Sequence, residues 1–310
     1  MAAASLNAVE VGGLRKEFRA RSGRRIAVDG LDLSVAWGEV HGLLGPNGSG
    51  KTTTIRMLMG LVYPDQGSIS VFGKRVPELI HEVIDRVGAI VEQPKFIPSF
   101  SGRRNLELLA RATGRPAARV EAVLEQTRLS EFGAERFNSY SLGMKQRLGI
   151  AAVLLKEADL IIFDEPTNGL DPTGIKEIRQ TIRDLRDQGH TVLVSSHVLA
   201  EIQSVATSVS ILRRGRVLAA GRIEDVLAKG GSSTLRLRVS DAQAARRTIT
   251  ELGLKVSPHH DSRELLVHSI DEGVTADLVR TLSQNSIDIY DLSVNRPTLE
   301  DVFLDITEEA

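Results

Sequence analysis

Short apolar runs alternate with longer amphipathic stretches from about residue 9 to residue 220. Four of these runs are largely apolar and do not alternate between apolar and polar residues. Such runs are typical of strands buried on both faces of a sheet. They are Val40–Leu44, Ala89–Val91, Leu160–Phe163 and Val192–Ser195. Because the stretches between them have the spacing of helices, the pattern predicts an α/β domain around a mainly parallel sheet.

A helical insertion is predicted at about residues 94–157, between the second and third of these strands. Its apolar positions are three or four residues apart, as on one face of a helix. Two examples are the group at Leu106, Leu109 and Ala110 and the group at Val120, Val123 and Leu124. We therefore expect a helical subdomain inserted into the α/β domain.

A second, smaller domain is predicted to follow the segment Ala228–Ser233, whose paired glycines and serines are typical of a linker. We place the boundary between residues 230 and 231, giving domains 1–230 and 231–310. Beyond it the pattern predicts strands and helices in the order strand 235–239, helix 241–252, strands 254–257 and 264–269, helix 274–282 and strand 287–294. That order is the ferredoxin-like arrangement of an α+β domain.

The charge of the chain excludes some functions. The 310 residues carry 39 Lys and Arg against 40 Asp and Glu, and the part from residue 232 onward carries 8 against 14. A protein that binds nucleic acid or anionic lipid in general has a basic excess, so we expect no nucleic-acid partner. The chain has no cysteine, which excludes disulfides and thiolate catalysis. We also expect no secretory signal at the N-terminus and no membrane-spanning helix, because no apolar run approaches the required ~20 residues.

The strongest chemical signal is a glycine-rich loop that follows the predicted strand Val40–Leu44. It matches the pattern G-x-x-x-x-G-K-[ST] and consists of Gly45, Pro46, Asn47, Gly48, Ser49, Gly50, Lys51, Thr52 and Thr53. In this context the glycines let backbone N–H groups face phosphates, and the next helix presents its positive end to the same anion. Lys51 then contacts the β- and γ-phosphates, and Thr52 supplies a hydroxyl ligand to Mg²⁺. The loop predicts a site for a nucleoside triphosphate.

Two adjacent carboxylates, Asp164 and Glu165, follow the predicted strand Leu160–Phe163. Ligands of open α/β sheets bind at the carboxyl ends of the strands, so both side chains are expected to face the nucleotide. Asp164 suits the Mg²⁺ role of a Walker B aspartate, and Glu165 suits a general base that polarises the attacking water. An acidic pair at the end of a strand is by itself more often part of a solvated turn. The presence of the phosphate loop in the same chain favours the catalytic interpretation.

The stretch Tyr140–Arg147, YSLGMKQR, resembles the signature sequence of the ATPases of ABC transporters. The resemblance implies that Ser141 and Gly143 contact the γ-phosphate held by an opposite subunit, so that the site is shared by two copies. Leu142 and Met144 depart from the common form of the signature, where the family more often has Gly and Gln. Apart from the family, Ser141 is also suited to be the N-cap of a helix.

The remaining family motifs follow in order. Gln93 resembles the Q-loop glutamine, which senses Mg²⁺ and water, Asp171 belongs to a D-loop in the stretch Gly169–Pro172, and His197 resembles the switch histidine. The resemblance implies that His197 donates a hydrogen bond to the γ-phosphate. Phe18 occupies the place where the family stacks an aromatic ring on adenine, although packing in the core remains an alternative for it.

The family resemblance covers about residues 9–229. The stretch Arg296–Phe303 extends it to the type of ATPase found in daunorubicin and bacitracin exporters. It implies an ATPase that binds ATP and Mg²⁺ and works as a dimer of identical copies. This dimer would drive a separate membrane-spanning permease at the cytoplasmic face of the membrane. The transported molecule is then expected to be a drug or another lipophilic compound.

Two other functions remain as alternatives. One is a soluble ABC-type ATPase that acts on ribosomes or in DNA repair, which the single phosphate loop and the charge balance disfavour. The other is a regulator that binds nucleotide without hydrolysing it, which the set Lys51, Asp164, Glu165 and His197 disfavours.

An apolar segment after Gln93 indicates where a partner binds. Phe96, Ile97, Pro98 and Phe100 are unusually apolar for a stretch that contains two prolines. We expect them to line a groove for a cytoplasmic helix of the membrane subunit. A small local core is the alternative interpretation.

Overall fold

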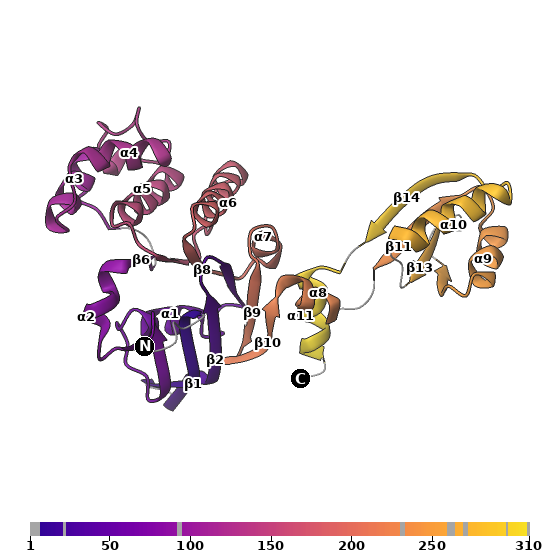
Figure 1. Cartoon of the computed structure of the whole chain (residues 1–310), viewed down its shortest axis with the longest axis horizontal. Helices are drawn as coiled ribbons and strands as arrows, with labels where there is room; N and C mark the ends of the chain where they lie inside the picture. The colour runs from indigo at the N-terminus through magenta and orange to yellow at the C-terminus, as the bar shows by residue number, and fades with distance from the viewer. Residues whose placement is uncertain are drawn as a thin grey trace, which may run out of the picture. The chain divides into compact units, whose positions relative to one another are not determined.

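A computed structural model describes residues 7–20, 23–91, 95–229, 233–258, 264–268, 272–295 and 297–308. Its contacts divide the chain into one unit that ends at Ile223 and a second that begins at Glu224. Each unit is described by itself below (Figure 1). In the described part of the chain, no helix combines the length and the apolar character needed to cross a bilayer.

The first unit is built around a six-stranded sheet in the order β10-β9-β3-β8-β7-β6. All its strand pairs are parallel except that of β9 with β10. The strands are β3 (Val40–Leu44), β6 (Val87–Ile90), β7 (Leu160–Asp164), β8 (Thr191–Ser196), β9 (Ser208–Arg213) and β10 (Arg216–Arg222). The four strands predicted from uninterrupted apolar runs are β3, β6, β7 and β8, and the α/β fold with a mainly parallel sheet is confirmed.

A second sheet of the first unit was not anticipated by the sequence reasoning. It is antiparallel, has the order β2-β1-β4-β5, and consists of β1 (Asn7–Ala20), β2 (Gly23–Ala36), β4 (Gln66–Val71) and β5 (Lys74–Val76). Its buried side chains share one core with α1 (Lys51–Leu58) and with one face of the parallel sheet. The long strands β1 and β2 carry many charged residues, and this obscured their alternating pattern.

Helices cover the other face of the parallel sheet. α6 (Pro172–Asp187) and α7 (Leu199–Gln203) both contact β8, and they lie on the opposite side of the sheet from α1 (Figure 1). The short α2 (Ile80–Val83) and the 3₁₀ turn η1 (Ile84–Arg86) lead into β6. Both faces of β3, β7 and β8 are therefore buried, which explains their continuous apolar sequence.

The insertion between β6 and β7 is helical, as predicted. It contains α3 (Gly102–Ala112), α4 (Ala118–Gln126), the 3₁₀ turn η2 (Phe137–Ser139) and α5 (Leu142–Leu155). The three α-helices contact one another. Tyr140 is buried before α5, and its hydroxyl donates to the Phe132 carbonyl at 2.8 Å. Burial raises the pKa of Tyr140, so this hydroxyl stays protonated as a donor.

The second unit contains a four-stranded antiparallel sheet with its own core. Its elements are β11 (Thr234–Val239), α9 (Ala242–Glu251), β12 (Val256–Pro258), β13 (Glu264–His268), α10 (Glu272–Gln284) and β14 (Ile289–Asn295). The strand order β12-β13-β11-β14, with all pairs antiparallel, confirms the ferredoxin-like arrangement.

Two helices flank this ferredoxin-like part in the sequence. They are α8 (Ile223–Lys229) and α11 (Leu299–Glu308). The division of the chain after Ile223 lies before the boundary predicted after residue 230, and the first two residues of the predicted linker, Ala228 and Lys229, belong to α8. Residues 230–232 lie outside the described residues.

Candidate functional site

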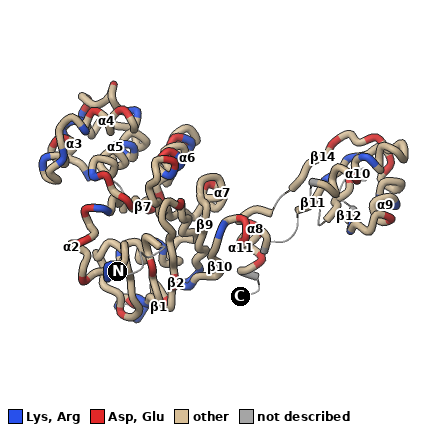
Figure 2. Tube along the Cα trace, in the orientation of Figure 1, with Lys and Arg blue, Asp and Glu red and all other residues tan. Residues whose placement is uncertain are grey.

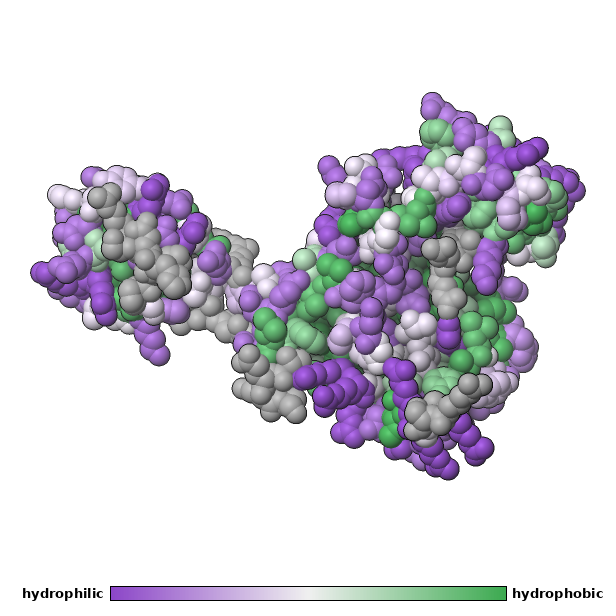
Figure 3. Space-filling model, turned by 180° about the vertical axis from the view of Figure 1, so that it is seen from behind, coloured by the Kyte–Doolittle hydropathy of each residue, from purple (hydrophilic) through white to green (hydrophobic). Residues whose placement is uncertain are grey.

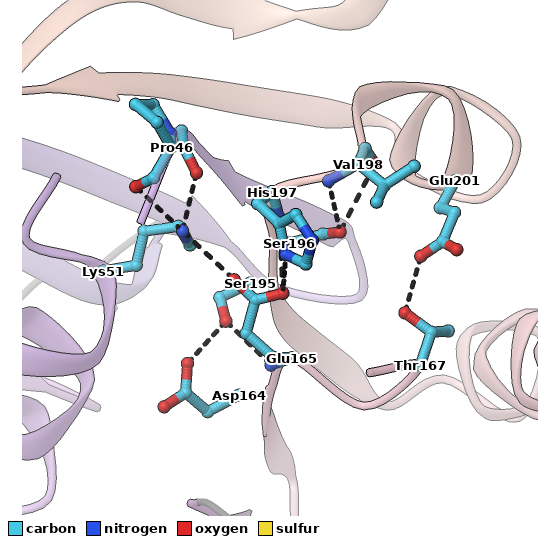
Figure 4. A network of polar contacts seen from close by, with 11 residues as sticks. Pro46, Lys51, Asp164, Glu165, Thr167, Ser195, Ser196, His197, Val198 and Glu201 are labelled. Atoms are coloured by element: carbon cyan, nitrogen blue, oxygen red, sulfur yellow. Dashed lines mark hydrogen bonds and ion pairs between the residues drawn. The ribbon is translucent and has the colours of Figure 1, made fainter. Parts of the chain in front are cut away.

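Three adjacent strands carry the predicted site residues to one edge of the parallel sheet. β3 lies beside β8, and β8 lies beside β7. The glycine-rich loop follows β3, Asp164 ends β7, and His197 follows β8. Because parallel strands end at the same edge, segments more than 100 residues apart meet there (Figure 4). The backbone N–H of Gly45 also donates to the Ser196 carbonyl at 3.3 Å, which ties the loop to β8.

Glycine is required in the loop at two positions for steric reasons. Gly45 has φ +151° and Gly50 has φ +110°, and L-residues rarely adopt such angles. A Cβ atom at Gly45 would lie 2.2 Å from the Leu212 carbonyl oxygen, and one at Gly50 would lie 2.7 Å from that of Ala27. The loop therefore keeps its curled shape only with a bare backbone at these two positions.

The loop leads into the N-terminus of α1, where N–H groups face outward without intrahelical acceptors. Gly50 is the N-cap and provides no side-chain hydrogen bond to them. In the same loop the buried hydroxyl of Ser49 has no hydrogen-bond partner among the described residues. These unsatisfied donors and the positive end of the helix dipole suit a phosphate group.

Lys51 lies at the centre of the site and is only 5% exposed. Its Nζ donates to the carbonyl oxygens of Gly45 at 2.6 Å and Pro46 at 3.3 Å, and it lies 3.1 Å from Oε1 of Glu165. A buried ammonium group needs such partners because its desolvation is costly. The same position lets it exchange carbonyl oxygens for phosphate oxygens.

Asp164 and Glu165 are both held by Ser195 of β8, a residue that the sequence reasoning did not single out. The Ser195 hydroxyl donates to Oδ1 of Asp164 at 2.6 Å and accepts from the backbone N–H of Glu165 at 2.9 Å. Ser195 and Asp164 are direct partners in the pairing of β7 with β8. The only indication of this role in the sequence is weak, namely a serine on the strand that precedes His197. The contacts of Ser195 become apparent only from the pairing of β7 with β8.

Glu165 connects Lys51 with His197. Its Oε2 lies 2.7 Å from Nδ1 of His197, while its Oε1 contacts Lys51 (Figure 4). Glu165 also has φ +50°, the left-handed region that non-glycine residues seldom occupy. Such strain is concentrated at functional sites, where the surrounding structure enforces it. Here the buried β7, the Ser195 hydroxyl and the two side-chain partners fix the carboxylate.

Phe18 lies at the mouth of the site and not in the core, since 41% of its surface is exposed. Together with Arg25 and Ala27 it lines a pocket of about 410 Å³. The other residues of that pocket are Asn47, Gly48, Gly50, Lys51, Thr52, Thr53 and Glu165. The packing alternative for Phe18 therefore finds no support, and the exposed ring lies beside the phosphate loop. Arg25 is a further lining residue that the sequence reasoning missed.

The signature and D-loop residues are not part of this pocket. Ser141 caps α5 by accepting from the Met144 N–H at 3.2 Å, which confirms the N-cap prediction. Asp171 likewise caps α6 by accepting from the Gly174 N–H at 3.0 Å. Both side chains are at the surface, and a Cβ at Gly143 would meet nothing within 4 Å. Gln93 lies outside the described residues.

A separate apolar groove runs between β6 and the helical subdomain. Its volume is about 540 Å³, and its lining includes Met59, Ile84, Phe96, Leu109 and Val153. Phe96 also packs edge-to-face on Phe137, with ring centroids 5.2 Å apart. Beside the groove, hydrophobic side chains reach the surface between the helical subdomain and α2 (Figure 3).

The predicted partner segment is thus divided between two environments. Phe96 belongs to the groove, whereas Ile97 and Phe100 are 43% and 37% exposed. The alternative interpretation, a small local core, does not apply to Ile97 and Phe100, because side chains inside a core would be buried.

The residues present suit a Mg²⁺ ion that arrives with a nucleotide. Asp164 is 6% exposed and its Oδ1 is oriented by Ser195, while Thr52 is half-buried in the first turn of α1. In the described part of the chain no cluster of three or more His, Asp or Glu side chains is arranged to hold a metal. Mg²⁺ commonly binds through one or two protein ligands, with phosphate and water completing its octahedron.

Comparisons with known proteins agree with this geometry. Residues 28–168 match the model of the ABC transporter family. Daunorubicin resistance ATP-binding protein DrrA3 of Streptomyces coeruleorubidus is 36% identical, over 97% of this chain and 96% of that protein. Bacitracin transport ATP-binding protein BcrA of Bacillus licheniformis is also 36% identical, over 91% and 92%. A solved ATP-binding subunit of an ABC transporter is 31% identical with a TM-score of 0.63, over 71% of this chain and 92% of that one.

Proposed function

The chain is an ATPase of the ABC transporter family, and from this premise we propose that it drives transport by a separate membrane-spanning subunit. The observation that carries the proposal is the meeting of Lys51, Asp164, Glu165 and His197 at the ends of three neighbouring strands. Together with the phosphate loop, this set provides both nucleotide binding and hydrolysis. A regulator without turnover would not need the strained, doubly held Glu165.

Binding begins at the phosphate loop. The first turn of α1 and Lys51 hold the β- and γ-phosphates, and Phe18 stacks on the adenine. Thr52, Asp164 and Gln93 would hold a Mg²⁺ ion, which would supply positive charge to neutralise the phosphates. Phosphate oxygens compete with Glu165 for Lys51, which frees the Glu165 carboxylate to accept a proton from the attacking water. His197 orients Glu165 through Nδ1 and stabilises the transferring phosphoryl group.

A second copy of the chain completes each site. Ser141, Gly143 and Asp171 are separate from the pocket around Lys51, yet they are at the surface, with open space beside Gly143. A second, antiparallel copy can bring its signature segment onto the γ-phosphate held by the first. Closing around two ATP molecules and opening after hydrolysis then supplies the mechanical step.

The apolar groove is the site proposed for the membrane subunit. Its lining connects Met59, which directly follows α1, with the helical subdomain through Phe96. A cytoplasmic helix seated there would sense the movement between the phosphate loop and the signature. The chain would thus be bound at the cytoplasmic face of the membrane through its partner.

The transported class is proposed from the relatives. A daunorubicin resistance protein and a bacitracin transport protein both align over more than nine-tenths of this chain. We therefore assign export of a drug or another lipophilic compound, with the substrate contacts residing in the membrane subunit.

The test combines turnover with partner identification. Glu165→Gln should retain ATP binding and lose at least ~100-fold in hydrolysis rate, since general-base catalysis contributes about 10²–10⁴-fold. Glu125→Gln, on the exposed face of α4, is the matched control and should hydrolyse ATP normally. An ordinary rate for Glu165→Gln would refute the role of the base.

The same Glu165→Gln chain, tagged and purified from detergent-solubilised cells with MgATP, tests the transporter assignment. Mass spectrometry should find a multi-span membrane protein in near-equal amount. Recovery of ribosomal or DNA-repair partners instead would favour the soluble ABC-type ATPase and leave the ATPase assignment intact.

A further inference from the structure

The two edges of the C-terminal sheet differ in a way that nucleotide hydrolysis does not explain. One edge is β12, which has three residues and ends at Pro258. The other edge is β14, which has seven residues and contains neither proline nor lysine. Among the described residues, β14 pairs with β11 alone, so its outer backbone groups are available. Exposed edges of natural sheets are normally short, charged or interrupted, because a long open edge pairs with another strand.

Two apolar side chains of β14 lie next to the core of the second unit and also reach its surface. Leu292 is paired with Leu237, and Val294 is paired with Leu235. The two β11 residues are fully buried, whereas Leu292 and Val294 are 37% and 43% exposed. Directly paired residues lie on the same face of a sheet. At the β14 edge, the face of the sheet that packs on the core therefore has two partly exposed aliphatic side chains.

The sequence of β14 is suited to pair with itself. It carries Asp291 as its single charged residue (Figure 2), and that carboxylate lies 3.6 Å from Arg236 of β11. In an antiparallel pair centred on Ser293, Leu292 faces the partner's Val294 and Asp291 faces the partner's Asn295. Aliphatic side chains then meet on one face, polar ones meet on the other, and no like charges are opposed.

We propose that β14 is a self-pairing edge, through which the C-terminal units of two copies of this chain form one antiparallel sheet with Ser293 on the twofold axis. Such an interface is isologous, because the same strand serves both copies. A second copy fits better than an unrelated peptide, since the pattern from Asp291 to Asn295 reads polar, apolar, polar, apolar, polar in both directions.

The contact is small, so the paired state is expected to exchange rapidly. Only one strand edge and two aliphatic side chains per copy are covered, well below the area of a stable dimer. The pairing itself needs no nucleotide, and its test is therefore independent of the proposed ATPase cycle.

Disulfide trapping detects such a transient pair and gives its register. The chain has no cysteine, so each variant of the full chain carries a single thiol. With Ser293→Cys the two Cα atoms lie about 5 Å apart across the antiparallel pair, within the range that a disulfide spans. Mild oxidation without nucleotide should convert most of this variant to a dimer on a non-reducing gel.

Asn295→Cys is the matched control on the same strand and face. Its two copies would be four residues out of register, about 13 Å apart at ~3.3 Å per residue, and should form several-fold less dimer. A mixture of Asn295→Cys with Asp291→Cys should restore crosslinking, because these positions face each other. Equal crosslinking of Ser293→Cys and Asn295→Cys, or no gain in the mixture, would overturn the proposal.

A substitution at the aliphatic contact provides the second test. Leu292→Lys in the Ser293→Cys background should lower the dimer yield several-fold, whereas Leu252→Lys, at an exposed position after α9, should leave it unchanged. If the purified Ser293→Cys chain stayed monomeric but was crosslinked to the membrane subunit in cells by a bifunctional thiol reagent, self-pairing would be refuted in favour of strand donation by that subunit.

Discussion

Ser195→Ala is predicted to weaken both the fold and the catalytic site. The Ser195 hydroxyl is fully buried and makes two hydrogen bonds, one to the Asp164 carboxylate at 2.6 Å and one from the Glu165 N–H at 2.9 Å. The substitution leaves a buried carboxylate oxygen and a backbone N–H without this partner. It also releases the segment that holds Glu165 in its strained conformation.

The magnitude follows from these two contacts. A hydrogen bond to a charged group contributes about 1.5–3 kcal/mol, and an orphaned buried N–H costs about 1–3 kcal/mol. Because the two share one hydroxyl they do not add fully, so we expect a loss of roughly 2–4 kcal/mol in the free energy of unfolding. In a unit of this size that lowers the melting temperature by about 4–16 °C.

Urea unfolding of the full chain and ATP hydrolysis measure the two effects. Ser196→Ala is the control. Among the residues that the structure describes, this neighbouring buried hydroxyl hydrogen-bonds only the backbone N–H and carbonyl of Val198, and its loss should cost about 1 kcal/mol. ATP hydrolysis should fall more for Ser195→Ala than for Ser196→Ala, even at temperatures where both are folded. Equal stability and equal rates for the two variants would refute the reasoning.

Three further predictions concern other parts of the chain. Gly102→Ala places a Cβ 2.1 Å from the Tyr140 hydroxyl, so the free energy of unfolding should fall by about 1–3 kcal/mol, measured by thermal denaturation; an unchanged melting temperature would contradict it. Asp241→Ala removes the N-cap of α9 and should cost about 1 kcal/mol in the second unit while ATP hydrolysis stays normal, which urea titration and a phosphate-release assay check. Phe100→Asp should abolish co-purification of the membrane subunit without lowering the ATPase rate of the isolated chain, and intact co-purification would count against the groove.

The sequence alone located the phosphate loop and the adjacent carboxylates. The loop from Gly45 to Thr53 and the pair Asp164–Glu165 were predicted at strand ends, because a buried parallel strand is a continuous apolar run and a phosphate loop has fixed spacing. The helical insertion and the order of elements in the C-terminal unit could also be predicted, since each depends on local periodicity. These features depend on residues close together in the sequence, so they can be predicted without knowing which distant residues are in contact.

Other features required the tertiary structure. The N-terminal antiparallel sheet was missed because β1 and β2 are long strands with charged residues and register shifts, which blur the alternation. Ser195 acquires its role only when β8 lies beside β7, and Phe18 is distinguished from a core residue only by its exposure beside Asn47 and Gly48.

The sequence by itself determined the phosphate loop, the carboxylates at the end of β7 and the segments with a continuous or periodic apolar pattern, since these depend on residue type and short-range spacing. The tertiary structure decided which of these residues meet. It placed Lys51, Glu165 and His197 in contact, separated Ser141 and Asp171 from them, and left β14 as an open edge. The physical reason is that strand order and pairing register depend on contacts between residues far apart in the chain, which no local pattern contains.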